Sequence, residues 1–65
     1  MDDYVKFRKP LFLDGELVFE TNQSYKVLSE DKENLYIQDP RGVKQGKYNW
    51  VSQLPKNATD IYCWV

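Results

Sequence analysis

The sequence predicts an all-β fold, a small antiparallel barrel built from five or six short strands. Apolar residues recur at every second position through most of the chain, turn signals separate these runs, and no sustained helical period is present. Alternation of this kind is typical of strands with one buried face, and many short strands with turns between them are typical of a barrel. The 65 residues suffice for a single domain, 1–65, that buries only about 60% of the surface its unfolded chain exposes.

The first third of the chain predicts a broken strand followed by a hairpin. In "VKFRKPLFL" the inward positions of the alternation are Val5, Phe7, Leu11 and Leu13. Pro10 has no N–H to donate, so we expect an edge or a break there. "DG", residues 14–15, separates "LFL" from "ELVFE". This dipeptide predicts a tight hairpin, because both central residues of the favoured turn take positive φ. A wider loop is the alternative, since the following "TNQ" is also typical of a turn.

Two further strands are expected on either side of the charged loop "EDKEN", residues 30–34. "SYKVLS" places Tyr25 and Val27 on one face. "LYIQ" places Leu35 and Ile37 inward and Tyr36 outward. We interpret the loop between these strands as a solvated hairpin tip.

"DPRG", residues 39–42, matches a type I turn, since Asp begins it, Pro fixes φ and Gly closes it. The next strand would run from about 43 to 50. If that strand were regular, polar side chains would be buried beneath Leu35 and Ile37, which is costly. A bulge at Gly46 would move the later side chains to the other face. We therefore expect Tyr48 and Trp50 in the core; the alternative is that they form a partner-facing patch.

The C-terminal segment predicts a turn at 55–59 and a short last strand, "IYCWV", residues 61–65. There Ile61, Cys63 and Val65 alternate with Tyr62 and Trp64. Tyr36 is the first candidate for an outward-facing ring, and Tyr62 and Trp64 are the next.

Three stretches resemble a known family: "ETNQSYKV", "LYIQDPRG" and "KQGKYNW". Together with the residues between them, from Phe19 to Leu54, they are similar to short SH3-like barrel proteins of Gram-positive bacteria and their phages or prophages. The resemblance implies a strongly bent, five-stranded antiparallel SH3-like barrel with a short helical turn before the last strand, which "VSQLP", residues 51–55, would supply. The functions of that family are mostly undefined, so the resemblance implies a fold and not an activity.

The composition argues against catalysis. Histidine is absent, so the commonest general base near neutral pH is missing. The single cysteine, Cys63, has no histidine to activate it and is expected to be a small buried hydrophobe. Clusters of metal ligands and glycine-rich phosphate loops are also missing. We therefore expect no enzyme activity, no metal and no cofactor. No apolar run resembles a signal or a membrane span, so we expect a cytoplasmic protein with no membrane partner.

The first functional hypothesis is a monomeric protein-interaction module, because aromatic rings on a rigid scaffold are typical of binding hot spots. In the phage or prophage setting that the resemblance suggests, it would bind or inhibit a host protein. The expected surface is formed by Tyr36, Arg41, Lys47 and Trp50.

Two other classes stay open. A small barrel that binds single-stranded nucleic acid would use two basic clusters: Lys6, Arg8 and Lys9, and Arg41, Lys44 and Lys47. The net charge of −1 argues against it, because phosphate contacts need positive potential. A structural homo-oligomer would instead pair copies through an exposed strand edge or the C-terminal "IYCWV".

Overall fold

The computed structural model describes residues 3–65 and confirms that this part of the chain is mostly β, with one short helix. The elements are β1 (Tyr4–Phe7), β2 (Leu11–Leu13), β3 (Glu16–Phe19), β4 (Ser24–Glu30), β5 (Asn34–Gln38), α1 (Pro40–Lys44), β6 (Val51–Pro55) and β7 (Tyr62–Trp64). All strand pairs are antiparallel. They form a five-stranded sheet in the order β6-β5-β4-β1-β7 and a separate two-stranded sheet, β2-β3.

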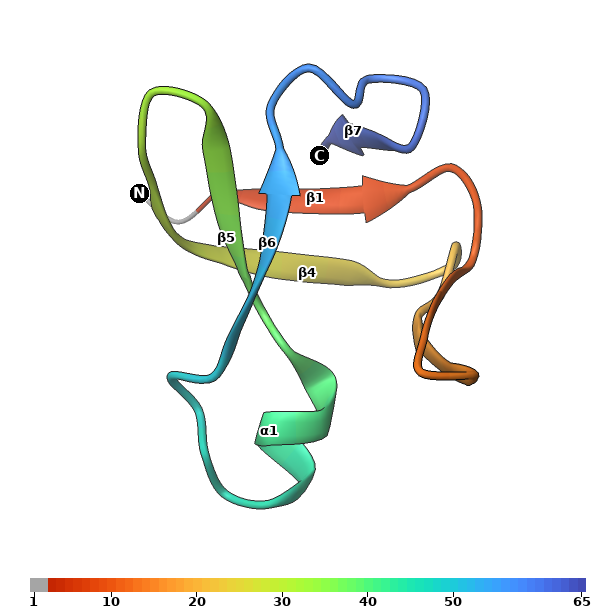
Figure 1. Cartoon of the computed structure of the whole chain (residues 1–65), viewed down its shortest axis with the longest axis vertical. Coiled ribbons are helices and arrows are strands. Elements are labelled where there is room, and N and C mark those ends of the chain that lie inside the picture. The colour runs from red at the N-terminus through yellow and green to blue at the C-terminus, as the bar shows by residue number, and fades with distance from the viewer. Residues whose placement is uncertain (1–2) are drawn as a thin grey trace.

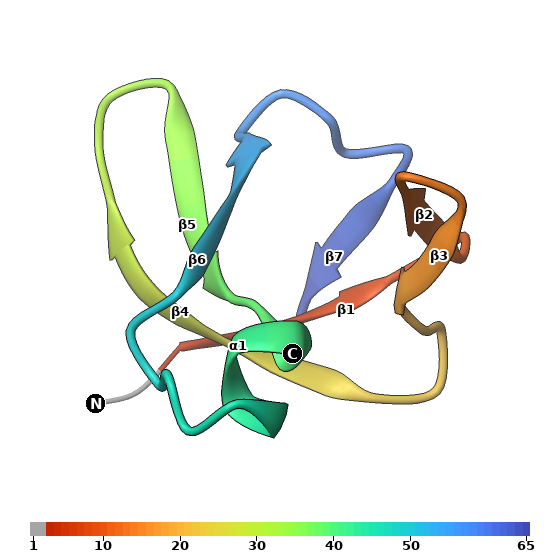
Figure 2. The same ribbon diagram turned by 60° about the horizontal axis from the view of Figure 1, so that its bottom comes forward.

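The five-stranded sheet is bent, so that β5 and β6 cross over β1 and β4 at a steep angle (Figures 1 and 2). A register shift between Val27 and Ser29 lies in β4, where this strand turns from β1 toward β5. Bulges increase the local bend of a strand, which explains the change of direction. β6 and β7 are the two ends of the sheet and do not pair with each other among the described residues. The all-β expectation is confirmed, whereas closure into a five-stranded barrel stays a prediction.

The predicted N-terminal hairpin is confirmed. β1 ends at Phe7, and the chain resumes as β2 at Leu11, on the far side of Pro10. Asp14 and Gly15 have φ values of 53° and 77°, and they connect Leu13 to its partner Glu16. Positive φ at both positions matches the right-handed twist of the flanking strands, as expected for a two-residue hairpin.

The core is closed by aromatic rings and aliphatic side chains from both sheets. Phe7 stacks on Phe19 with ring centroids 4.7 Å apart, and Tyr25 meets Phe19 edge-on at 4.9 Å. The Tyr25 hydroxyl accepts a hydrogen bond of 2.7 Å from the backbone N–H of Glu20, so its polar end is satisfied. The buried apolar side chains are Val5, Phe7, Val18, Phe19, Tyr25, Leu35, Ile37, Leu54 and Tyr62. The predicted inward positions of β1 and β5 are thereby confirmed, as is the charged hairpin tip between β4 and β5.

The predicted strand at 43–50 is wrong, because the chain forms α1 and then a loop. Asp39 caps the helix, because its side chain accepts a hydrogen bond from the backbone N–H of Arg41. Pro40 is the first residue of the helix. Proline is well suited to this place, since its fixed φ is helical and its missing N–H would be unpaired anyway. Gly46 has a φ of 76° and follows the end of α1, so it is not a bulge within a strand.

Three related expectations are also wrong. Tyr48 and Trp50 are not core residues, since they are 63% and 38% exposed. The strand at 43–50 that would have turned their side chains inward is absent. "VSQLP" forms β6 instead of a helical turn. Tyr62 faces inward, is buried, and donates its hydroxyl to the carbonyl of Lys56 at 2.9 Å, whereas Trp64 is exposed as expected.

Gly42 permits the close approach of α1 to the loop that follows it. A Cβ at this position would lie 2.4 Å from the Cβ of Trp50 and 2.7 Å from the carbonyl oxygen of Lys47. Backbone atoms cannot move aside without disturbing the loop, and Lys47 N–H donates to the Gly42 carbonyl at 2.7 Å. Any larger residue here would therefore separate the helix from Trp50.

We expect Gly42→Ala to destabilise the protein by about 2 kcal/mol, because overpacking outweighs the gain of about 1 kcal/mol in helix propensity. Urea unfolding followed by circular dichroism measures the change. Gly46→Ala is the comparison: no atom lies within 4 Å of its Cβ position, so only backbone strain of about 1 kcal/mol applies. Unchanged or increased stability of Gly42→Ala would contradict the close packing described here.

Candidate functional site

A buried carboxylate joins three elements at one end of the sheet. The Asp39 side chain is 0% exposed, and its Oδ1 accepts hydrogen bonds from the Arg41 backbone N–H at 2.8 Å and from Arg41 Nε at 3.1 Å. Its Oδ2 accepts from Arg41 Nη2 at 2.8 Å and from Ser52 Oγ at 2.7 Å. The Asp39 backbone N–H donates to the carbonyl of Trp50 at 2.8 Å. One residue therefore connects the end of β5, the first turn of α1 and the start of β6.

The charged form of Asp39 is the stable one in the folded protein. Burial alone raises the pKa of this carboxyl, and it is the largest single influence. The hydrogen bonds from Arg41 and Ser52, together with the positive charge of Arg41, outweigh burial and hold the pKa below its usual value. Hydrogen bonds to an ionised group are stronger than those between neutral groups. Asp39 is therefore a structural carboxylate.

Two cations lie close to the ring of Trp50, the residue whose carbonyl accepts from the Asp39 N–H. The guanidinium carbon of Arg41 is 5.6 Å and Lys47 Nζ is 5.8 Å from the centroid of the indole ring. Both distances are within the range of cation–π attraction. Tyr48 is exposed beside Lys47, and Gln38 Nε2 donates to its carbonyl at 2.8 Å, which ties the loop to β5. With Lys44 of α1, we call the set Arg41, Lys44, Lys47, Tyr48 and Trp50 the aromatic-cationic surface.

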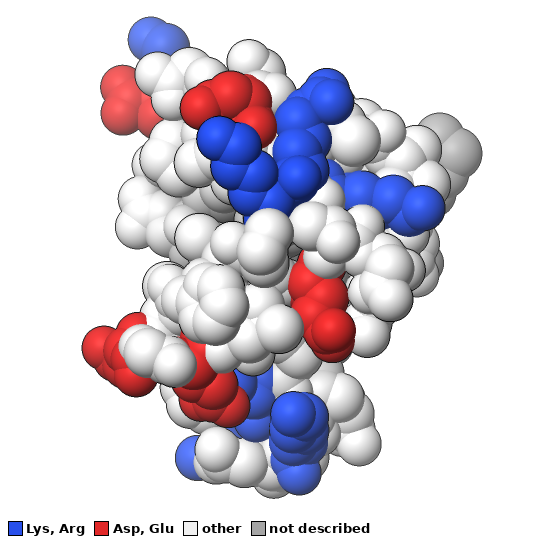
Figure 3. All heavy atoms as spheres, turned by 90° about the vertical axis from the view of Figure 1, so that its right-hand side faces the viewer, with Lys and Arg blue, Asp and Glu red and all other residues white. Residues whose placement is uncertain are grey.

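The charge of this surface is carried mainly by its lysines. The hydrogen bond to Asp39 is the largest influence on Arg41 and raises the pKa of its guanidinium, and the charges of Asp39, Glu16 and Asp14 add to it. Arg41 is thus partly neutralised by acidic neighbours, whereas Lys44 and Lys47 are exposed. On the side of the molecule that faces right in Figure 1, basic and acidic side chains are interleaved and form no continuous basic stripe (Figure 3). The positive potential is local.

The structure brings together three of the four residues that were expected to form the site: Arg41, Lys47 and Trp50. Tyr36 lies elsewhere: its hydroxyl donates to Asp31 Oδ2 at 2.6 Å, at the hairpin tip. Asp31 Oδ1 also accepts from the backbone N–H groups of Glu33 and Asn34. The hydrogen bond from Tyr36 is the largest cause, and together with the two backbone bonds it lowers the pKa of Asp31. The hydrogen bond to Asp31 also raises the pKa of Tyr36. Tyr36 braces the β4-β5 turn.

The sequence interpretation missed Asp39, Ser52 and the exposure of Tyr48. Asp-Pro at residues 39–40 is a helix-start signal as well as a turn signal, since aspartate is a favoured N-cap and proline a favoured first helical residue. A helix of five residues is too short to show a helical period, so the turn interpretation prevailed.

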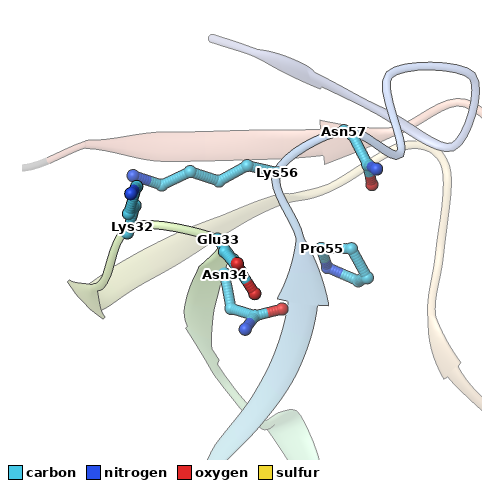
Figure 4. Close-up of a pocket in the computed structure, with 6 residues that line it drawn as sticks. All are labelled: Lys32, Glu33, Asn34, Pro55, Lys56 and Asn57. Atoms are coloured by element: carbon cyan, nitrogen blue, oxygen red, sulfur yellow. The ribbon is translucent and has the colours of Figure 1, made fainter.

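A hollow of about 500 Å³ lies at the opposite end of β5 and β6, between the hairpin tip and the start of the β6-β7 loop (Figure 4). Its lining residues are Lys32, Glu33, Asn34, Pro55, Lys56 and Asn57. Lys56 Nζ lies 3.8 Å from Glu30 Oε1, and its backbone N–H donates to the carbonyl of Glu33. The walls carry both signs of charge and no exposed aromatic ring, so this hollow is a weaker candidate than the aromatic-cationic surface.

Two kinds of feature are absent from residues 3–65. No group of three or more histidine, cysteine, aspartate or glutamate side chains within this range is placed to hold a metal ion. None of the helical structure described is long and apolar enough to cross a membrane. Cys63 is half-buried and free.

No protein-family model, curated protein or solved structure matches this chain. The resemblance to short SH3-like barrel proteins therefore stays a prediction, and we infer a function from the geometry of the chain itself.

We expect Asp39→Asn to lower the free energy of unfolding at pH 7 by about 2 kcal/mol, because charged hydrogen bonds are lost in a buried place. Since the folded-state pKa of Asp39 is depressed, its contribution is present above the unfolded value of about 3.9 and is lost as pH falls through the folded value. The difference in unfolding free energy between wild type and variant should therefore disappear as the pH is lowered. Urea unfolding between neutral and strongly acidic pH measures it; a gap that is the same at every pH would contradict the assignment.

Proposed function

We propose that the chain is a small non-catalytic protein-interaction module that docks through the aromatic-cationic surface. The observation that carries the proposal is the exposure of Tyr48 and Trp50 in a loop whose backbone is tied down on both sides. The core is closed without either ring. Exposed tyrosine, tryptophan and arginine on a rigid frame are the residues that contribute most to protein interfaces.

The rigidity of the loop favours binding. The Asp39 N–H bond to Trp50, the Lys47 N–H bond to Gly42 and the Gln38 bond to the Tyr48 carbonyl hold the loop at three points. A side chain that is already ordered loses less conformational entropy when a partner binds. The exposed lysines add positive charge, so the complementary partner surface is acidic.

The other expectations belong to the same proposal. The bent antiparallel sheet is compatible with an SH3-like barrel, and we retain that fold type, a monomeric state and a cytoplasmic location as expectations. A phage or prophage protein that binds or inhibits a host protein is the biological setting that the sequence resemblance suggests.

Single-stranded nucleic acid is the second candidate ligand, favoured by the position of Tyr48 beside Lys47, where a base could stack while its phosphate meets the ammonium. Two arginines that would serve phosphates are already engaged. Arg41 binds Asp39, and Arg8 Nε donates to the carbonyls of Thr59 and Tyr62. Protein therefore remains the preferred ligand.

Affinity capture from the source lysate, quantified by mass spectrometry, tests the proposal. The baits are the wild type, a Lys47→Glu/Tyr48→Ala double variant and a Lys32→Glu control at the far end of β5. Since Lys47, Tyr48 and Lys32 are all exposed, the three proteins should be equally stable. We expect a protein partner whose recovery falls at least about tenfold with the double variant, as for loss of a binding hot spot, and is unchanged with the control.

Three results would contradict the proposal. Equal recovery with all baits would place the interface elsewhere. Recovery that disappears after nuclease treatment would favour nucleic acid. A bait that captures only itself and elutes as an oligomer from a sizing column would favour the structural homo-oligomer.

A further inference from the structure

We infer that the outer edge of β6 accepts an extended acidic peptide segment of the partner protein, which adds to the sheet as a further strand. The segment would pair with the backbone of Val51 and Gln53 and place its carboxylates beside Lys47. This inference rests on the proposed function and names the chemistry of the partner.

The hydrogen-bond pattern leaves one side of β6 open. The register pairs Gln38 with Val51, Ile37 with Ser52 and Tyr36 with Gln53. In the same register Asp39 N–H donates to Trp50 and Lys56 N–H donates to Glu33, so the hydrogen-bonded pairs are those of the even-numbered residues in β6. The N–H and C=O groups of Val51 and Gln53 therefore point away from β5. β6 ends the sheet, and no other strand within residues 3–65 pairs with it on that side.

The composition of this edge does not protect it from pairing. Natural edge strands are often protected by charged side chains, bulges or proline. β6 reads "VSQLP" and contains no charged residue. Its proline, Pro55, lies at the last position, and its carbonyl accepts from the N–H of Ala58 at 3.1 Å, so that end is closed. The open part of the edge is thus the half that adjoins Trp50.

The charges beside the open half select the occupant. Arg41 and Lys47 lie within 6 Å of the Trp50 ring centroid, at the residue that immediately precedes β6. A peptide strand that pairs antiparallel to β6 would bring its C-terminal end to this place, where acidic side chains meet the exposed ammonium of Lys47, since Arg41 is already paired with Asp39. Main-chain bonds would supply affinity and the charges would supply specificity, as in known cases of strand addition.

A second copy of the chain fits this edge less well. Two antiparallel β6 edges would bring the aromatic-cationic surface of one copy against the Pro55 end of the other. That end carries both signs of charge, with Lys32 and Lys56 beside Glu33. An acidic segment offers the better electrostatic match.

The probe for this inference is a synthetic peptide of about eight alternating threonine and valine residues that ends in two glutamates, since alternate side chains and main-chain pairing define strand addition. Amide exchange measured by NMR on the labelled full-length protein is the readout. We expect the N–H groups of Val51 and Gln53 to exchange at least about tenfold more slowly with peptide bound, because they become hydrogen-bonded. The already paired N–H groups of Ser52 and Leu54 should change less.

Four controls separate the main-chain pairing from the charge recognition. A peptide N-methylated on its pairing edge should bind at least about tenfold more weakly, because it cannot form the ladder. A peptide ending in two lysines should lose as much, as should the glutamate peptide with Lys47→Glu but not with Lys32→Glu. Gln53→Pro should block binding yet preserve the fold, since the lost N–H faces away from β5. The methylated peptide gives the same answer without altering the protein.

The inference is overturned if the glutamate peptide binds without protecting Val51 and Gln53, if the methylated peptide binds equally well, or if no binding is detected at millimolar peptide. Tighter binding of an oligothymidine strand, or protection of the same two amides by self-association alone, would assign the edge to nucleic acid or to a second copy. A partner captured through Lys47 and Tyr48 but unaffected by Gln53→Pro would leave the proposed function standing and remove only the strand addition.

Discussion

The arrangement of this small protein depends on the ionised, buried carboxylate of Asp39. A charge taken out of water is costly unless it is paired and hydrogen-bonded. Here Arg41 and Ser52 supply that compensation, and the same contacts fix where β5 ends, where α1 begins and how β6 enters the sheet. Arg41 binds Asp39 through one edge of its guanidinium, while its central carbon lies over the Trp50 ring. One side chain therefore contacts both the buried carboxylate and the exposed aromatic residue. The stability of the fold and the position of the aromatic-cationic surface thus depend on one set of interactions.

The same constraint explains why two large rings remain in water. The core is filled by the Phe7, Phe19 and Tyr25 cluster and by aliphatic side chains of β5 and β6. Gly42 lets the loop pass so close to α1 that Trp50 packs on the helix backbone from outside. In the sequence, Tyr48 lies two residues before Trp50, and β6 begins directly after it. The exposed aromatic residues and the open strand edge are thus neighbours in sequence, at the point where the loop enters β6.

Much of the fold could be predicted from sequence because alternation and turn chemistry are local signals. The Asp14-Gly15 hairpin, the charged tip before β5 and the inward faces of β1 and β5 are examples. The segment after Asp39 could not be predicted in this way. "DPRG" satisfies both a type I turn and a capped helix. In the helical form the Asp39 carboxylate also accepts a hydrogen bond from Ser52, thirteen residues later, and local sequence signals do not reveal a contact of this range. The wrong local choice then placed Tyr48 and Trp50 in the core. Arg41, Lys47 and Trp50 lie together, as expected of residues that are close in sequence. Tyr36 lies apart from them, where its hydroxyl donates to Asp31 at the hairpin tip.

Native-state hydrogen exchange on Asp39→Asn tests the central claim most directly, namely that this carboxylate orders the aromatic-cationic surface. The reporters are the N–H groups of Gln45, Gly46, Lys47 and Trp50, which are hydrogen-bonded within α1 and its loop. If the carboxylate holds this segment, these amides lose protection by a larger factor than those of the β1-β4 pair, because the segment opens locally. No loss of protection in this segment would show that the loop is ordered without Asp39. An equal loss throughout the protein would show that Asp39 stabilises the fold as a whole and not this segment in particular. Either result would contradict the account.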